Sequence, residues 1–335
     1  MSAANPSAVS PTPAPLFSPS DLASATELVH SHMVATPAIS WPLLSEHLGV
    51  DVVVKHENCT PTGAFKVRGG LVFMDRLRRQ RPDVTGVISA TVGNHGLSLA
   101  WAGRLFGVAV VIVVPQGTDS ERIASLQVLG AEVVVEGEDF EAARQHSALL
   151  AEQRGLELVP AFHPDLVLGV ATYAKELFSQ AGPLDAVYVP IGMGSGICGL
   201  ITTRDMLGLD TEIVGVCASG APTQKLSFQA GKVVATEHVD TFAAGVATRQ
   251  PDPISAAIIR AGAHDVISVD DDDTAEAVRQ LWRTTHHLAE PAGAIATAAA
   301  LNDSANRTGQ RIGVVMTGAN IDTKSAWVVL GGGTA

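Results

Sequence analysis

The sequence predicts an α/β fold in which mainly parallel sheets are covered by helices. The composition is the first reason: of 335 residues, 46% are hydrophobic and only 17% are charged, which supports a large buried core. The second reason is that short β-branched runs alternate with longer helical patterns, and these runs are almost continuously apolar. Strands of that kind are buried on both faces, as in a parallel sheet between layers of helices.

The strand candidates are spread along most of the chain. They lie at residues 51–55, 86–90, 108–114, 131–135, 186–190, 212–217, 265–269 and 312–316. Helical patterns lie between them at 94–106, 119–129, 139–154, 170–181, 273–287 and 291–302. Strands and helices in this order predict parallel sheets with helices on both faces.

Charge and cysteine content exclude several classes of protein. The net charge is −12 without an extended basic stripe, which argues against a nucleic-acid partner. The three cysteines fit no zinc or redox spacing, and this favours a reducing, cytoplasmic location. The longest strongly apolar run, at 108–115, is far shorter than the roughly 20 residues of a spanning helix, so no membrane partner is expected. Residues 1–18, rich in Ala, Pro and Ser, predict a disordered lead without a signal peptide.

Polar, glycine-rich segments follow three of the expected strands. These are SATVGNHG at 89–96, PIGMGSGICG at 190–199 and MTGAN at 316–320. Ligands bind parallel sheets at the carboxyl ends of their strands. Together with the turn TPTGAFKVRGG at 60–70, these segments are expected to form four walls of one site.

The segment GSGICG at 194–199 matches the dinucleotide pattern G-x-G-x-x-G. A dinucleotide site also needs an acidic residue at the end of the next strand, but ASGAP at 218–222 has none. Four glycines, at 192, 194, 196 and 199, and the Ser195 hydroxyl instead favour a cradle for one phosphate group. A tight turn without a ligand is the alternative.

Lys66 is one of only six lysines and stands directly behind an aromatic residue, Phe65. A lysine beside a phosphate cradle suggests a phosphate-bearing aldehyde cofactor held as a Schiff base. Partial burial behind Phe65 would lower the pKa of Lys66 and so favour the neutral amine. The alternatives are a lysine that binds phosphate as a point charge, a non-catalytic binder of phosphorylated ligands and a nucleotide-dependent oxidoreductase.

Five segments in family order resemble the fold-type II pyridoxal-phosphate enzymes, whose fold is tryptophan synthase β-like. The resemblance is to the branch of threonine and serine dehydratases, also called ammonia-lyases, and it spans about residues 20–325. The segments are ENCTPTGAFKVRG at 57–69, SATVGNHG at 89–96, VPIGMGSGICG at 189–199, HHLAEPAGA at 286–294 and VMTGAN at 315–320.

The resemblance implies a role for each matching residue. Lys66 would carry pyridoxal 5'-phosphate (PLP), with Phe65 beside it. Asn94 would hydrogen-bond the cofactor's phenolic oxygen, Glu290 would lie near the ring, and Thr317 would face the pyridine nitrogen. The phosphate would lie on Gly192, Met193, Gly194, Ser195 and Gly196. The substrate carboxylate would lie on the loop formed by Thr91, Val92, Gly93, Asn94 and His95.

The implied reaction converts a β-hydroxy amino acid, by default threonine or serine, to a 2-oxo acid and ammonia. A neutral Thr317 opposite the ring nitrogen suits this elimination. Val92 occupies the position where racemases of the family carry a proton-transferring serine, so racemisation is disfavoured. Alternatives are a dehydratase for 3-hydroxyaspartate or phenylserine, and a β-replacement enzyme of the cysteine synthase type.

The resemblance also implies two domains, with the cofactor between them. The smaller domain is expected at residues 50–155 and the larger, cofactor-binding one at 19–49 and 156–330. A homodimer is expected because relatives are commonly dimers. No metal site is expected, because Ala218 stands where cation-binding relatives have an acidic ligand, and the adjacent His286 and His287 would diverge on a helix.

Overall fold

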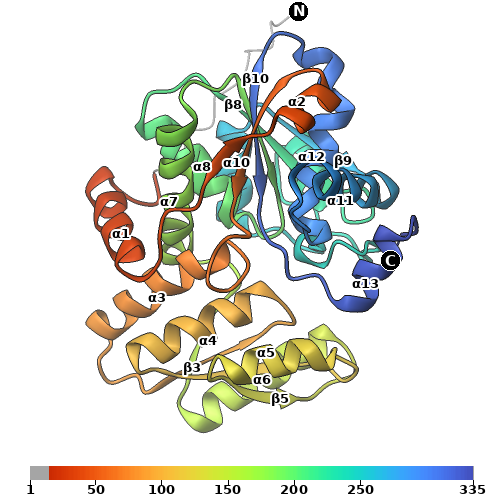
Figure 1. Cartoon of the computed structure of the whole chain (residues 1–335). Helices are drawn as coiled ribbons and strands as arrows, with labels where there is room; N and C mark the ends of the chain where they lie inside the picture. Colours follow the sequence, from red (N-terminus) through yellow and green to blue (C-terminus); the bar gives the residue numbers. More distant parts are fainter. Residues whose placement is uncertain (1–14, 335) are drawn as a thin grey trace, which may run out of the picture.

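Two sheets form the framework of the chain (Figure 1). The computed structural model describes residues 15–334. The larger sheet has six strands in the order β1-β2-β10-β7-β8-β9, and the smaller has four in the order β5-β4-β3-β6. Every pairing in these two sheets is parallel except that of β1 with β2. The predicted α/β class with mainly parallel sheets is therefore confirmed.

The expected strands are all present, with ends that differ by at most one residue. The strands are β1 Ala38–Ser40, β2 Asp51–His56, β3 Gly86–Ala90, β4 Ala109–Val114, β5 Glu132–Val135, β6 Glu157–Leu158, β7 Ala186–Pro190, β8 Glu212–Ala218, β9 Asp265–Val269 and β10 Arg311–Met316. The helices are α1 Pro19–His32, α2 Pro42–Leu48, α3 Lys66–Gln80, α4 Asn94–Phe106, α5 Ser120–Val128, α6 Phe140–Arg154, α7 Pro164–Ala181, α8 Ser195–Met206, α9 Thr223–Ala230, α10 Pro253–Gly262, α11 Asp271–Thr285, α12 Pro291–Asp303 and α13 Thr323–Leu330, with short 3-10 turns at Ala244–Val246 and Ser304–Arg307.

The larger sheet is buried on both faces, which explains its apolar strands. Along β7, Val187 and Val189 pack in one core cluster with residues of α7 and α8. Ala186 and Tyr188, which alternate with them, pack in a second cluster with residues of α11 and α12. Because successive side chains point to opposite faces, a strand covered on both sides must be apolar throughout.

The strand pairing differs from the predicted domain boundaries at both ends of the smaller domain. The smaller domain was expected to begin at residue 50, yet β2 (Asp51–His56) pairs with β10 over its whole length in the larger sheet. It was expected to end at residue 155, yet β6 (Glu157–Leu158) pairs with β3 in the smaller sheet. Both boundaries depended on long-range pairing, which no local pattern in the sequence encodes.

The predicted disordered lead is too long at its C-terminal end. Residues 1–14 lie outside the described residues, but Phe17 is buried and Ser18 caps α1. The Ser18 hydroxyl accepts a hydrogen bond from Asp21 N, and the Asp21 carboxylate accepts one from Ser18 N. This reciprocal capping fixes the start of α1. None of the described helices combines the length and the apolar character needed to cross a membrane.

The order of the larger sheet brings three of the predicted segments side by side. β2, β10 and β7 are neighbours and run parallel, so the turns after them leave the same edge. Those turns are residues 57–65, called here the lysine turn, 317–320 and 191–194. The segment after β3 comes from the smaller sheet, which lies below the larger one in Figure 1.

Candidate active site

Lys66 is the first residue of α3, and its amine faces the glycine-rich turn. Nζ donates a hydrogen bond to Ser195 Oγ at 3.1 Å and lies 5.3 Å from the centre of the Phe65 ring. Loss of solvent around the amine lowers the pKa of Lys66 from 10.5 to about 8. An appreciable share of the amine is therefore neutral near physiological pH, as a nucleophile or a base requires.

The turn after β7 places Ser195 beside this amine. Gly194 has a φ of 100°, a conformation that suits glycine, and a Cβ there would lie 2.7 Å from Ser255 Oγ. Helix α8 begins at the next residue, and the first N–H groups of a helix have no partner within it. A glycine turn that opens a helix is a suitable cradle for a phosphate.

The rest of this turn is held by hydrogen bonds to its carbonyl groups. Gly192 O accepts from Gln224 Nε2 at 2.8 Å, and Gly196 O accepts from the Tyr173 hydroxyl at 2.9 Å. Met193 is half-buried and packs against the core. Because the carbonyl groups are bonded behind the turn, its N–H groups remain available to an anion.

Asn94 and Glu290 lie at the starts of α4 and α12 and contact each other directly. Asn94 Nδ2 donates to Glu290 Oε1 at 2.6 Å. Asn320 Nδ2 donates both to Asn94 Oδ1, at 2.7 Å, and to Thr62 O, at 2.8 Å. Burial raises the pKa of Glu290 from 4.5 to about 6, although the hydrogen bond from Asn94 opposes the rise. These contacts tie four of the predicted segments together.

Thr317 lies against the lysine turn. Its backbone oxygen accepts a hydrogen bond from Phe65 N at 3.0 Å, and its hydroxyl donates to Ala292 O at 3.2 Å. The side chain is buried. The predicted role of this neutral hydroxyl, as the partner of a ring nitrogen, stays a prediction.

The loop at 91–95 leaves one buried polar atom without a partner. Gly93 N donates to Thr91 Oγ1 at 3.3 Å, and Val92 O accepts from Arg122. His95 is buried, and within residues 15–334 its Nε2 has no hydrogen-bond partner. Burial lowers the pKa of His95 to about 3, so the ring is neutral at pH 7. An unpartnered buried nitrogen is an available contact for a bound ligand.

The structure therefore connects all the predicted segments, but the sequence analysis missed two polar residues among them. Asn320 bridges Asn94 and Thr62, and its place in the segment 315–320 was an available signal. Arg122 lies on α5, where no motif marks it. The roles of the individual residues toward a ligand stay predictions.

Comparison with known proteins identifies the family. The family model described as pyridoxal-phosphate dependent enzyme matches residues 29–318. The chain belongs to this family. This PLP-dependent enzyme is 32% identical over 303 residues to an L-threo-3-hydroxyaspartate ammonia-lyase of Pseudomonas sp, covering 90% of this chain and 95% of the relative. It is 34% identical over 306 residues to an L-threonine ammonia-lyase of Geobacter sulfurreducens, covering 91% and 73%.

The solved structures agree with this assignment. The processed form of threonine deaminase isoform 2 from Solanum lycopersicum matches with a TM-score of 0.86 and 30% identity, covering 93% of this chain and 88% of that one. The predicted fold type, the resemblance to the dehydratase branch and the PLP cofactor are confirmed.

The residues present fit PLP. The cofactor has an aldehyde at one end and a phosphate at the other, so it needs an amine close to an anion cradle. The 3.1 Å contact between Lys66 Nζ and Ser195 Oγ provides that proximity. Lys66 would hold the aldehyde, and the turn at 192–196 would hold the phosphate.

Proposed function

We propose that this enzyme is an ammonia-lyase that converts a β-hydroxy amino acid to a 2-oxo acid and ammonia. The observation that carries the proposal is the desolvated Lys66 amine beside the Ser195 turn. The backbone oxygen of Thr317 accepts a hydrogen bond from Phe65 N, so this residue, which has a neutral hydroxyl, lies next to the lysine turn. PLP, when bound, supplies an electron-withdrawing group that acidifies the Cα–H bond of an attached amino acid.

Lys66 is the base in this proposal. Its Nζ would take the Cα proton, and a pKa of about 8 leaves enough neutral amine to do so at pH 7–8. Val92 supports elimination over racemisation, because a valine at the position of the racemase serine cannot exchange a proton. Thr317 offers a hydroxyl in place of a carboxylate, so it would not hold a protonated ring nitrogen.

The remaining residues would orient the ligands. The N–H groups of the loop at 91–95 and the unpartnered His95 Nε2 would hold the substrate carboxylate. Asn94 and Glu290 would lie beside the cofactor ring, held by Asn320. Each of these groups would restrict the substrate to the geometry in which the Cα–H bond faces the lysine.

The substrate is proposed as threonine, serine or 3-hydroxyaspartate, because the relatives are named for threonine and L-threo-3-hydroxyaspartate. The test is a panel of threonine, serine, threo- and erythro-3-hydroxyaspartate and phenylserine, assayed for 2-oxo acid and ammonia. We expect one hydroxy amino acid to give both products in equal amounts.

A parallel assay tests the rival reaction. The holoenzyme is supplied with O-acetylserine and sulfide, and cysteine is measured. Cysteine formation without 2-oxo acid from any member of the panel would overturn the proposal in favour of β-replacement. Borohydride treatment followed by peptide mass analysis identifies the lysine that carries the cofactor, and a site other than Lys66 would also overturn it.

We also propose that the enzyme is a cytoplasmic homodimer of two-domain subunits. Cys59, Cys198 and Cys217 are free thiols, which supports a reducing compartment. The two sheets support a division into two domains. Light scattering of the purified holoenzyme and fractionation of the producing cells test the dimer and the location.

A further inference from the structure

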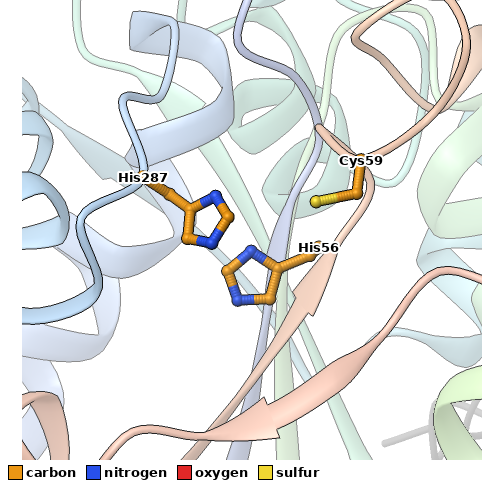
Figure 2. Close-up of side chains that lie close together, drawn as sticks. All are labelled: His56, Cys59 and His287. Carbon is orange, nitrogen blue, oxygen red and sulfur yellow. The ribbon is translucent and has the colours of Figure 1, made fainter.

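A cluster outside the PLP site brings together His56, Cys59 and His287 (Figure 2). His56 ends β2, Cys59 lies in the lysine turn, and His287 lies between α11 and α12. One ligand atom of each residue lies within 4.8 Å of the other two. Figure 2 shows the two rings facing each other and the thiol pointing toward them. The sequence analysis set His287 aside, because it expected two adjacent histidines to diverge on a helix, but α11 ends at Thr285 and both histidines follow it.

We propose that His56, Cys59 and His287 bind one divalent transition-metal ion of the Zn²⁺ class. Two imidazoles and a thiolate are the donors that Zn²⁺ prefers, whereas Mg²⁺ and Ca²⁺ require oxygen ligands. Ligand atoms around tetrahedral Zn²⁺ lie roughly 3.3–3.8 Å apart, given bonds of about 2.0–2.3 Å. Closing the cluster from 4.8 Å therefore needs side-chain movements of about 1 Å. Cys59 is exposed and opens the cluster to solvent.

Asn58 is a candidate for the fourth ligand. Its amide lies between the rings, with Oδ1 3.2 Å from His56 Nδ1 and Nδ2 3.2 Å from His287 Nδ1. An ion between the rings must turn this amide aside or take its oxygen as a ligand. Either way, two hydrogen bonds are exchanged for metal bonds.

The hydrogen bond from Trp41 holds His56 in the tautomer that opposes metal binding through Nδ1. Trp41 Nε1 donates to His56 Nε2 at 2.9 Å, and an indole can only donate. The proton of the neutral His56 ring is therefore on Nδ1, which faces Asn58. A metal bond to Nδ1 moves that proton to Nε2, where it would meet the indole N–H, so the ion must displace Trp41. A metal site therefore predicts that loss of the Trp41 indole strengthens ion binding, whereas a cluster held only by hydrogen bonds does not predict this.

The ion would join two segments that lead into the PLP site. Cys59 lies in the lysine turn, which leads to Lys66, and His287 lies three residues before Glu290. An ion between them would restrain both segments without contacting the reacting atoms. The inference does not depend on which reaction the enzyme performs.

The test is equilibrium dialysis of the holoenzyme against Zn²⁺, and against Co²⁺ as a spectroscopic probe. We expect one ion per chain, with Co²⁺ giving visible tetrahedral bands and a thiolate charge-transfer band. Cys59→Ser and His287→Gln should weaken binding at least about 10-fold. Trp41→Phe should strengthen it about five-fold, because the hydrogen bond that opposes the ion is gone.

His286→Asn is the matched control. His286 neighbours His287 but is exposed and packs beside Trp282, and its φ of 57° is one that asparagine tolerates. This variant should bind as the parent does. Zn²⁺ binding that is equal in the parent, Cys59→Ser and His287→Gln would overturn the proposal, and so would weaker binding by Trp41→Phe. Thermal unfolding of each variant shows that it is folded.

Discussion

Lys55 and Lys66 stand eleven residues apart; Lys55 is buried and Lys66 is half-buried, and they face different partners. Lys55 Nζ donates to Glu176 Oε2 and to Thr36 O, each at 2.7 Å. The hydrogen bond that the structure describes for Lys66 Nζ goes to the neutral Ser195 hydroxyl at 3.1 Å. Burial lowers the pKa of both lysines, and two carboxylates oppose this at Lys55 only.

The comparison distinguishes a lysine that belongs to a structural cluster of paired charges from a lysine that is proposed to react. Lys55 and Arg68 are paired with Glu57 and Glu176, so two positive charges meet two negative charges in the interior. Every charge in that cluster has its counter-charge, whereas no carboxylate among residues 15–334 forms an ion pair with Lys66. Groups left without a counter-charge inside a protein are the ones whose pKa shifts into the range of catalysis.

The largest effect is expected from Lys66→Met. Product formation should fall at least about 10³-fold, because this removes both the proposed attachment point of the cofactor and the proposed base. The apoenzyme should be at least as stable as the parent, since a half-buried amine that has no counter-charge among the described residues is lost. Initial rates of 2-oxo acid formation and urea unfolding measure the two effects. Lys232→Met, at an exposed position, should change neither.

Lys55→Met should have the opposite pattern. It leaves two carboxylates facing one guanidinium in the interior, which costs about 3–5 kcal/mol of unfolding free energy. The enzyme that remains folded should retain its activity per folded molecule. Urea unfolding combined with active-site titration checks this prediction. A Lys55→Met enzyme as stable as the parent would contradict the distinction drawn between the two lysines.

Much of the site was predictable from the sequence because its parts are local. Each glycine-rich turn follows an apolar strand, and parallel strands deliver their ends to one edge. The contacts of Lys66 with Ser195, and of Asn94 with Glu290, join segments that the sequence had already singled out.

Other features depend on contacts that no local pattern carries. The three-residue β1 and the two-residue β6 are too short to show an alternation. The hydrogen bond between Asn58 and His287 joins residues 229 positions apart. The balanced cluster around Arg68 was missed for the same reason, since its charges look like surface charges until the fold brings them together.

Glu290→Gln tests the raised pKa of a buried carboxyl group. The folded state holds the Glu290 proton up to about pH 6, above the ordinary value of 4.5, so the parent loses stability as pH rises through this window. The glutamine keeps the hydrogen bond from Asn94 without a charge. The variant should therefore be more stable than the parent above pH 6.5 by on the order of 1–2 kcal/mol, and the gain should vanish near pH 4.5.

Unfolding of the two apoenzymes by urea at several pH values measures this difference. Glu152→Gln, an exposed position, is the control. A difference between Glu290→Gln and the parent that stays constant from pH 4.5 to 7.5 would contradict the assignment of the pKa.

Ser195→Ala should give the smallest effect. It removes the hydroxyl that accepts from Lys66 Nζ and that would donate to the phosphate, so the PLP dissociation constant should rise about five- to ten-fold, equivalent to about 1 kcal/mol. The rate at saturating PLP should change little. Titration of the apoenzyme with PLP gives both values, and Ser20→Ala, exposed on α1, is the control. An unchanged dissociation constant would place the phosphate elsewhere.

The position of β10 between β2 and β7 has a consequence for synthesis on the ribosome. The strands of the smaller sheet lie within residues 86–158 and can pair early, but the larger sheet stays split until residues 311–316 have emerged. Until then β2 and β7 each present an open edge, to which strands of other molecules can add. From the synthesis of β7 until β10 inserts, the nascent enzyme must therefore keep both open edges from pairing with other molecules, and the turns of the candidate site come together only at that last step.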